Sequence, residues 1–176
     1  MNVNELPKID KVTLNIGVGE GGQRLQNAKT LLSRISGKNP IITKAQQRNP
    51  TFKTRKGDPI GVKITLRGST AVDVVKRALE ARENRVSPTC FDKQGNIAFG
   101  VKEYIDYPGI VYDPSIGMMG FDVCITLMKP GKRITIRKIR KSRLPKKQRV
   151  SPAEAQEFFL KTFKAKIARE GEEREE

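Results

Sequence analysis

Three stretches of the chain carry apolar residues at every second position, and this feature constrains the fold more than any other. The stretches are Val12–Val18, Val62–Leu66 and Phe121–Leu127. A period of two places the apolar side chains on one face of a β-strand and the intervening side chains on the other. The pattern therefore predicts a mostly antiparallel sheet with one buried face and one open face.

Two segments carry apolar residues at helical spacing, and we expect them to cover the apolar face of the sheet. They lie at about Gln23–Ser36 and at Ala71–Leu79. Thr70 and Asp73 resemble a capping pair for the second helix. Strands and helices arranged in this way predict an α+β fold, with the helices packed on one face of the sheet.

A third helix is predicted near the C-terminus. Ser151–Glu154 reads Ser-Pro-Ala-Glu, in which Ser is a typical N-cap, Pro a typical first helical residue and Glu completes the capping box. Phe158, Phe159 and Phe163 follow at helical spacing. We expect them to pack in the core.

The net charge of +16 and the pI near 10.1 point to a polyanionic partner, either nucleic acid or an anionic membrane surface. No apolar run approaches the roughly 20 residues that cross a bilayer, and no signal-peptide pattern is present, so we expect a soluble intracellular protein. By its length the chain is one domain. We assign Met1–Arg169 to it and expect the Glu-rich Glu170–Glu176 to be a disordered acidic tail.

The sequence offers no catalytic or metal site. It contains no His, and Cys90 and Cys124 are too few for a zinc site or a disulfide framework, so we expect two thiols on the core side. Glu103, Asp106 and Asp113 have no partner base, and we interpret them as solvated or turn-capping acids. We predict neither a cofactor nor an enzymatic activity.

One motif leaves an enzymatic alternative open. Gly17, Gly19 and Gly22 match the G-x-G-x-x-G pattern of dinucleotide-binding proteins, between a strand and a helix. The preceding strand alternates instead of being apolar throughout, and no acidic residue lies between Glu20 and Asp58 to bind a ribose. A flexible turn is therefore the favoured interpretation.

Basic residues concentrate in three regions. The open face of the predicted sheet carries Lys11, Lys63 and Arg67. The segment Ile41–Gly68 reads as strand, long basic loop and strand. Lys129–Arg149 contains eleven Lys or Arg and no acid. Taken alone, this charge run fits a solvated or mobile arm as well as it fits a nucleic-acid-binding segment. Three isoleucines in this last region indicate that part of it is anchored: Ile134, Ile136 and Ile139.

RNA is favoured over DNA as the partner. No helix-turn-helix, zinc finger or basic zipper is visible, whereas sheets and extended loops suit the shallow minor groove of RNA and its 2′-hydroxyls. Thr13, Asn15 and Thr65 on the open face can donate to and accept from such hydroxyls. A general nucleic-acid chaperone that binds by charge alone remains an alternative.

Several blocks of sequence, in order along nearly the whole chain, resemble the ribosomal protein L5 family, in its archaeal and eukaryotic branch. The blocks are Val12–Glu20, Ile35–Lys38, Ile42–Ala45, Pro59–Gly68, Asn96–Gly100, Tyr112–Gly117 and Gly120–Asp122. The resemblance implies a non-catalytic component of the large ribosomal subunit, in the central protuberance of cytoplasmic ribosomes, with neighbouring ribosomal proteins as partners.

The resemblance also implies three RNA contacts. The open sheet face would bind 5S rRNA through Lys11, Thr13, Asn15, Lys38, Lys44, Lys63, Thr65 and Arg67. The basic loop would contact P-site tRNA through Arg48, Asn49, Pro50, Thr51, Phe52, Lys53, Thr54, Arg55 and Lys56. The basic run would meet large-subunit rRNA through Lys132, Arg133, Arg137, Lys138, Arg140, Lys141, Arg143, Lys146, Lys147 and Arg149.

Overall fold

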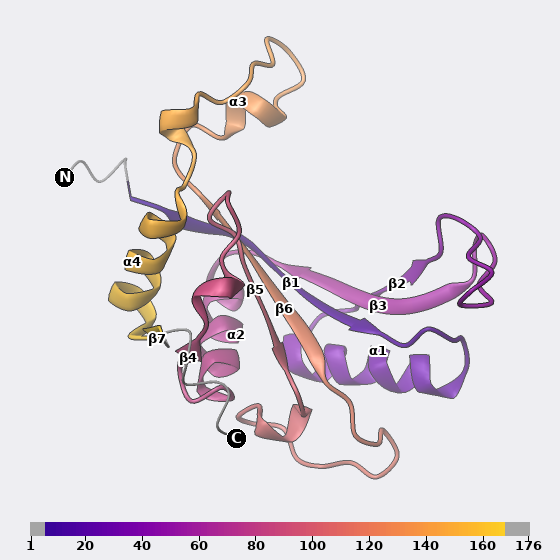
Figure 1. The fold of residues 1–176 in the computed structure, drawn as a ribbon. Helices are drawn as coiled ribbons and strands as arrows, with labels where there is room; N and C mark the ends of the chain where they lie inside the picture. The colour runs from indigo at the N-terminus through magenta and orange to yellow at the C-terminus, as the bar shows by residue number, and fades with distance from the viewer. Residues whose placement is uncertain (1–5, 168–176) are drawn as a thin grey trace.

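Five strands form one antiparallel sheet in the computed structural model, which describes residues 6–167 (Figure 1). The elements, in chain order, are β1 (Lys8–Gly17), α1 (Gln23–Ser36), β2 (Ile41–Lys44), β3 (Pro59–Leu66), α2 (Ser69–Glu80), β4 (Arg85–Val86), η2 (Pro88–Cys90), β5 (Ile97–Val101), η3 (Tyr104–Asp106), β6 (Phe121–Met128), α3 (Arg133–Ile136), η4 (Lys146–Gln148), α4 (Pro152–Phe163) and β7 (Lys166–Ile167). The order across the sheet is β2-β3-β1-β6-β5. The predicted α+β class is confirmed.

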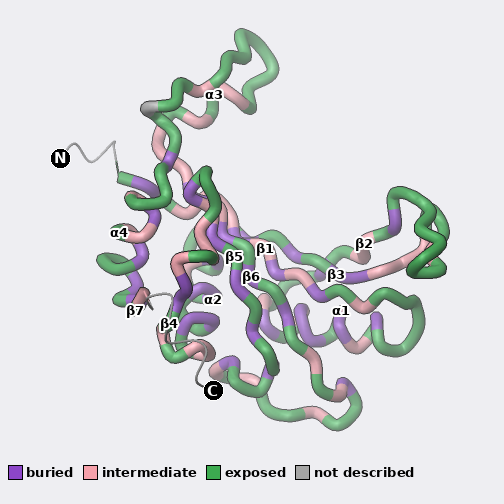
Figure 2. The backbone as a smooth tube through the Cα atoms, in the orientation of Figure 1, coloured by how far each residue is buried: buried purple, intermediate pink, exposed green. Residues whose placement is uncertain are grey.

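The three alternating stretches form the three central strands, and their apolar residues build the core. Leu14 of β1 is fully buried between Ile64 of β3 and Val123 of β6. Helix α1 packs against β3, and α2 packs against β1. Figure 2 shows the resulting alternation of buried and more exposed positions along these strands. One face of the sheet is therefore covered by helices, as predicted.

The predicted bounds of α1 are confirmed, but the predicted cap of α2 is wrong. Helix α1 ends at Gly37, whose φ of 66° lies in the left-handed region that glycine tolerates. Helix α2 is preceded by Gly68, and no side chain caps it. Thr70 already lies inside the first turn, so its hydroxyl donates to the carbonyl of Arg67 instead of capping the helix with Asp73.

Helix α4 begins with the predicted capping box. The Ser151 hydroxyl accepts from the Glu154 N–H, and the Glu154 carboxylate accepts from the Ser151 N–H. Phe159 and Phe163 are buried, and the Phe159 ring packs edge-on against Phe91. After the helix, β7 pairs in parallel with β4, an element too short to predict from periodicity.

The irregular connection from β5 to β6 is held by buried tyrosines and by one turn-capping acid. Tyr104 and Tyr107 are fully buried. The carboxylate of Asp113 accepts from the hydroxyl and the N–H of Ser115, and it lies 2.8 Å from the guanidinium of Arg34. These bonds, those from Ser115 first, hold the pKa of Asp113 below its ordinary value. The interpretation of Asp113 as a turn-capping acid is confirmed.

The expectation of two core-side thiols is wrong. Cys124 is exposed and Cys90 is half-buried. Cys124 lies between the buried Val123 and Ile125 of β6, so the period of two places its side chain on the open face. Within residues 6–167, no helix has the length and apolar character needed to span a membrane. The expected acidic tail, Glu170–Glu176, lies outside the described residues.

Candidate nucleic-acid interface

The open face of the sheet presents paired polar side chains from β1 and β3. Thr13 lies opposite Thr65, and Asn15 lies opposite Lys63. Lys63 and Thr65 are exposed, and the side chains of β1 on this face are half-buried by their neighbours. Five of the predicted 5S-binding residues therefore share one surface: Lys11, Thr13, Asn15, Lys63 and Thr65.

Beyond these two strands the open face is less basic. On β6 it carries Asp122 and Cys124, and on β5 it carries Ala98 and Gly100. Asp122 lies opposite Asn15, so a carboxylate interrupts the basic character of the face. Small residues leave the backbone accessible over this half of the sheet, which suits close approach by a large partner such as folded RNA.

Arg67 and the start of the basic run meet at a carboxylate on β1. A bulge between Ile9 and Lys11 changes the register with β6 at Asp10. The Asp10 carboxylate lies 3.0 Å from the Arg67 guanidinium and 2.7 Å from the Lys132 ammonium. Burial alone would raise the pKa of Asp10, but the hydrogen bond from Lys132 and the positive charges of Lys132, Arg67 and Lys11 together outweigh that effect and lower it. Arg67 is thus oriented by a partner within the chain.

The other two predicted 5S-binding residues lie at the edge of the sheet. Lys44 is exposed at the end of the edge strand β2, where a register shift pairs it with Pro59. Lys38 is exposed in the connection between α1 and β2, and its N–H donates to the Ser36 hydroxyl. The family resemblance placed both residues on the open sheet face, but the structure places Lys38 before the edge strand and Lys44 at its end.

The predicted tRNA-contacting loop forms a small hairpin. Asn49 and Thr54 exchange two backbone hydrogen bonds, and the Lys53 N–H donates to the Pro50 carbonyl across the tip. Lys53 adopts a positive φ of 52° to close this turn. The sequence predicted only a loop, although Asn49-Pro50 is a recognisable turn signal.

The hairpin presents an aromatic ring among cations. Phe52 lies at the tip and is 74% exposed. Arg48, Lys53 and Arg55 around it are also exposed. The base of the loop is fixed by the Asp58 carboxylate, which accepts from the Arg55 N–H at 2.7 Å. An exposed phenylalanine flanked by cations can stack on a base while the cations bind phosphates.

The basic run projects beyond one end of the sheet, after β6, as an arm that contains α3 and η4 (Figure 1). The expectation that its isoleucines anchor it is wrong, since Ile136 is 70% and Ile139 is 77% exposed. The anchors are ionic instead. Lys129 lies 2.6 Å from Glu154 of α4, and Lys132 is bound to Asp10.

Most of the predicted rRNA-binding cations on this arm are exposed. They are Arg133, Arg137, Lys138, Arg140, Lys141, Arg143, Lys146 and Arg149. Lys132 is half-buried at its anchor. The side chain of Lys147 lies outside what the structure describes.

The glycine-rich turn lacks the structural context of a dinucleotide site. In that fold the strand before the turn belongs to a parallel sheet, whereas β1 is antiparallel to both of its neighbours. The N–H groups of Val18 and Gly19, which a diphosphate would need, both donate to the carbonyl of Ile60. Gly17–Gly22 is a turn, and the nucleotide-binding alternative is wrong.

Comparison with known protein families covers almost the whole chain. The model described as ribosomal protein L5 matches residues 2–55, and the model of the C-terminus of the same ribosomal family matches residues 59–165. The chain belongs to the ribosomal protein L5 family. This membership confirms the resemblance found in the sequence, and it makes the chain a member of a family of ribosomal proteins and not of enzymes.

Curated members of the L5 family align with nine-tenths or more of the chain. Each of the following relatives is named large ribosomal subunit protein uL5. The protein of Methanosphaera stadtmanae is 44% identical over 167 residues, covering 95% of this chain and 99% of the relative. That of Pyrobaculum aerophilum is 46% identical over 159 residues, covering 90% and 89%. That of Sulfurisphaera tokodaii is 45% identical over 161 residues, covering 91% of each.

Proposed function

We propose that this chain, a structural protein of the large ribosomal subunit, binds 5S rRNA through the open face of its sheet. The observation that carries the proposal is the pairing of Thr13 with Thr65 and of Asn15 with Lys63 on a face that no helix of the described residues 6–167 covers. Hydroxyl and amide groups there suit 2′-hydroxyls and base edges, and Lys63 suits a phosphate. The family membership supports the ribosomal setting.

The loop hairpin would contact P-site tRNA. It is the segment Arg48–Lys56, and it extends away from the sheet beyond β2 and β3 (Figure 1). A projecting tip with an exposed ring at Phe52 fits a partner different from the RNA bound on the sheet face.

The arm Lys132–Arg149 would bind large-subunit rRNA. Its cations around α3 and η4 are exposed. The arm follows β6 at the opposite end of the central strands from the loop hairpin, which precedes β3 (Figure 1). The three contact regions would place the protein in the central protuberance of cytoplasmic ribosomes, among other ribosomal proteins. This assignment rests on the family resemblance together with the charge of the arm.

The test is a salt titration of the affinity of the purified protein for 5S rRNA and for an unrelated structured RNA of equal length. If the protein binds by charge alone, its affinity for both RNAs should decrease with salt concentration to the same extent, because counterion release does not depend on sequence or shape. We expect 5S rRNA to keep an advantage of at least about a thousandfold at high salt, the lower end of the range of specific over non-specific binding known for protein–DNA complexes. Coincident curves would instead support a general nucleic-acid chaperone.

The loop is tested by replacing Arg48–Lys56 with a short Gly-Ser linker. We expect unchanged affinity for 5S rRNA and impaired positioning of tRNA in reconstituted ribosomes. Equal loss of both would assign the loop to the 5S interface instead.

A further inference from the structure

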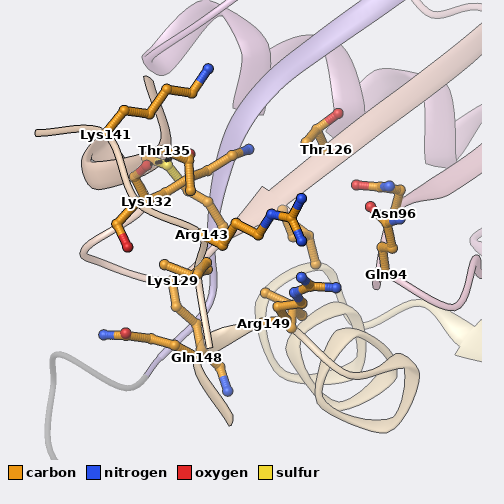
Figure 3. A pocket seen from close by; sticks show the side chains of 15 residues that line it. Gln94, Asn96, Thr126, Lys129, Lys132, Thr135, Lys141, Arg143, Gln148 and Arg149 are labelled. Atoms are coloured by element: carbon orange, nitrogen blue, oxygen red, sulfur yellow. Dashed lines mark hydrogen bonds between the residues drawn. The ribbon is translucent and has the colours of Figure 1, made fainter. Parts of the chain in front are cut away.

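A pocket of about 750 Å³ opens where the end of β6 meets the arm (Figure 3). Three segments form its walls: the turn before β5, the last residues of β6, and the arm from Lys132 to Val150. Its volume falls in the range of sites that enclose a small molecule. Other exposed cations of the arm, such as Lys138 and Arg140, do not line it.

The pocket has a surplus of positive charge. Among its described lining residues there are five cations and no carboxylate: Lys129, Lys132, Lys141, Arg143 and Arg149. Lys129 and Lys132 are already paired with Glu154 and Asp10. Within residues 6–167, neither Arg143 nor Arg149 forms an ion pair. Two guanidinium groups are therefore available for an anionic ligand.

The wall opposite the arm is polar but uncharged. Gln94 and Asn96 contribute amides and Thr126 a hydroxyl. Figure 3 shows the guanidinium groups of Arg143 and Arg149 directed toward the wall that carries Asn96. A ligand between the arm and this wall would meet cations on one side and both donors and acceptors on the other.

The two walls are held together by close packing. Gly95, between the two amide residues, is buried and has a φ of 73°. A Cβ at this glycine would lie 2.7 Å from Cγ1 of Val150 on the arm. The turn and the arm are therefore in tight contact beside the pocket, so the spacing of its polar groups is set by the fold.

We propose that this pocket takes a single nucleotide of an RNA strand, its phosphate bound by Arg143 and Arg149 and its base edge read by Asn96 and Gln94. Arginine binds phosphate with two parallel hydrogen bonds, and an amide can pair with a base edge. Proteins that read RNA sequence do so mainly on bases splayed out of the helix. The inference rests on the proposed RNA-binding function and adds a base-selective site to it.

The experiment titrates the full-length protein with the four 5′-nucleoside monophosphates and, separately, with inorganic phosphate. The side-chain amide resonances of Gln94 and Asn96 report on binding by NMR. We expect nucleotides to shift both resonances with affinities that differ between bases, and inorganic phosphate to shift them little. Equal responses to phosphate and to all four nucleotides would reduce the pocket to an anion site and overturn the proposal.

Three variants make the test specific. Arg143→Gln should weaken nucleotide binding by about tenfold or more, because it removes a charge-assisted pair. Arg24→Gln removes the same charge from the exposed side of α1, outside the pocket and outside the proposed RNA contacts, and it should leave nucleotide binding within about twofold. Asn96→Ala should abolish the difference between bases, while all four nucleotides still bind through their phosphate groups. Equal effects of the two arginine variants would show that only net charge matters.

The pocket and the proposed function can fail independently. If the protein prefers 5S rRNA but no mononucleotide binds, the nucleotide pocket is rejected and the proposed 5S binding is kept. Loss of that preference in wild-type protein would remove the 5S assignment, whatever the pocket binds.

Discussion

The ammonium group of Lys132 lies 2.7 Å from the carboxylate of Asp10, although the two residues are 122 positions apart in the chain. The same carboxylate lies 3.0 Å from Arg67 at the end of β3. Asp10 sits at the bulge of the central strand, so a local irregularity of β1 fixes the position of the arm. The sheet face and the arm are therefore one connected surface.

Removing this link should destabilise the protein in a pH-dependent way. The pKa of Asp10 in the folded protein lies below its ordinary value of 3.8. Such a group contributes stability above its ordinary pKa and loses it as the pH falls through the folded pKa. We expect Asp10→Asn to lower the free energy of unfolding by about 1 kcal/mol at neutral pH and by much less near pH 2. Urea denaturation across this range measures the difference.

Asp122→Asn is the matched control. Asp122 is also a carboxylate on the open face, but within residues 6–167 it forms no ion pair. Its substitution should change stability little at any pH. A pH-independent loss in Asp10→Asn would mean that the carboxylate acts through packing and not through charge.

The open face should be tested with substitutions that leave the core intact. Thr65→Ala removes an exposed hydroxyl, and Asn15→Ala removes a half-buried amide. We expect each to weaken 5S rRNA binding by about fivefold to twentyfold, since each removes hydrogen bonds to RNA, with little change in melting temperature. Thr30→Ala, on the exposed side of α1, is the control and should bind normally. A 5S affinity equal to that of Thr30→Ala would exclude both residues from the interface.

The ring of Phe52 should matter for tRNA and not for stability. It is 74% exposed, so Phe52→Ala removes almost no packing. Stacking of a base on an aromatic ring contributes about 1–3 kcal/mol, so we expect a loss of about fivefold or more in tRNA binding to reconstituted ribosomes. Phe52→Leu keeps an apolar side chain without the aromatic face. If it binds like wild type, the contact is hydrophobic and does not involve stacking.

Gly61 and Gly100 offer a matched pair for the close packing of the sheet. A Cβ on Gly61 would lie 2.6 Å from the carbonyl oxygen of Ile16, whereas a Cβ on Gly100 would meet only Asp122 Oδ1 at 3.5 Å. We expect Gly61→Ala to cost roughly 1–3 kcal/mol of unfolding free energy and Gly100→Ala less than about 0.5 kcal/mol. Thermal denaturation of both variants tests this, and equal melting temperatures would show that the β1–β3 pair can shift to accept the methyl group.

Elements with strong periodicity could be predicted from the sequence because local spacing and burial agree. The central strands and α1 follow this rule, and so does the capping box at Ser151. The cap predicted for α2 was wrong because the helix begins at Ser69, after Gly68, so Thr70 lies inside its first turn. Cys124 was predicted to lie on the core side because free cysteines are usually buried. Its position in the alternation of β6 already assigned it to the open face.

Features that depend on contacts distant in sequence could not be predicted. The bond between Asp10 and Lys132 requires β1 to lie beside β6, and no local pattern encodes that neighbourhood. The same holds for the pocket, whose walls come from residues near 95, 127 and 143. The residues of the open face were found because alternation assigns a face to each position, whereas Lys38 lies outside any strand and was assigned only by resemblance.

The central place of β1 in the sheet governs how the chain can fold as it is synthesised. Its partner β3 follows within about 50 residues, but β6, its other neighbour, ends at Met128. Until that point has emerged from the translating ribosome, one edge of β1, the strand that carries the apolar Val12 and Leu14, has no partner strand, which invites pairing with other chains. This ribosomal protein can therefore complete its sheet only after the ribosome has synthesised β6, late in the chain.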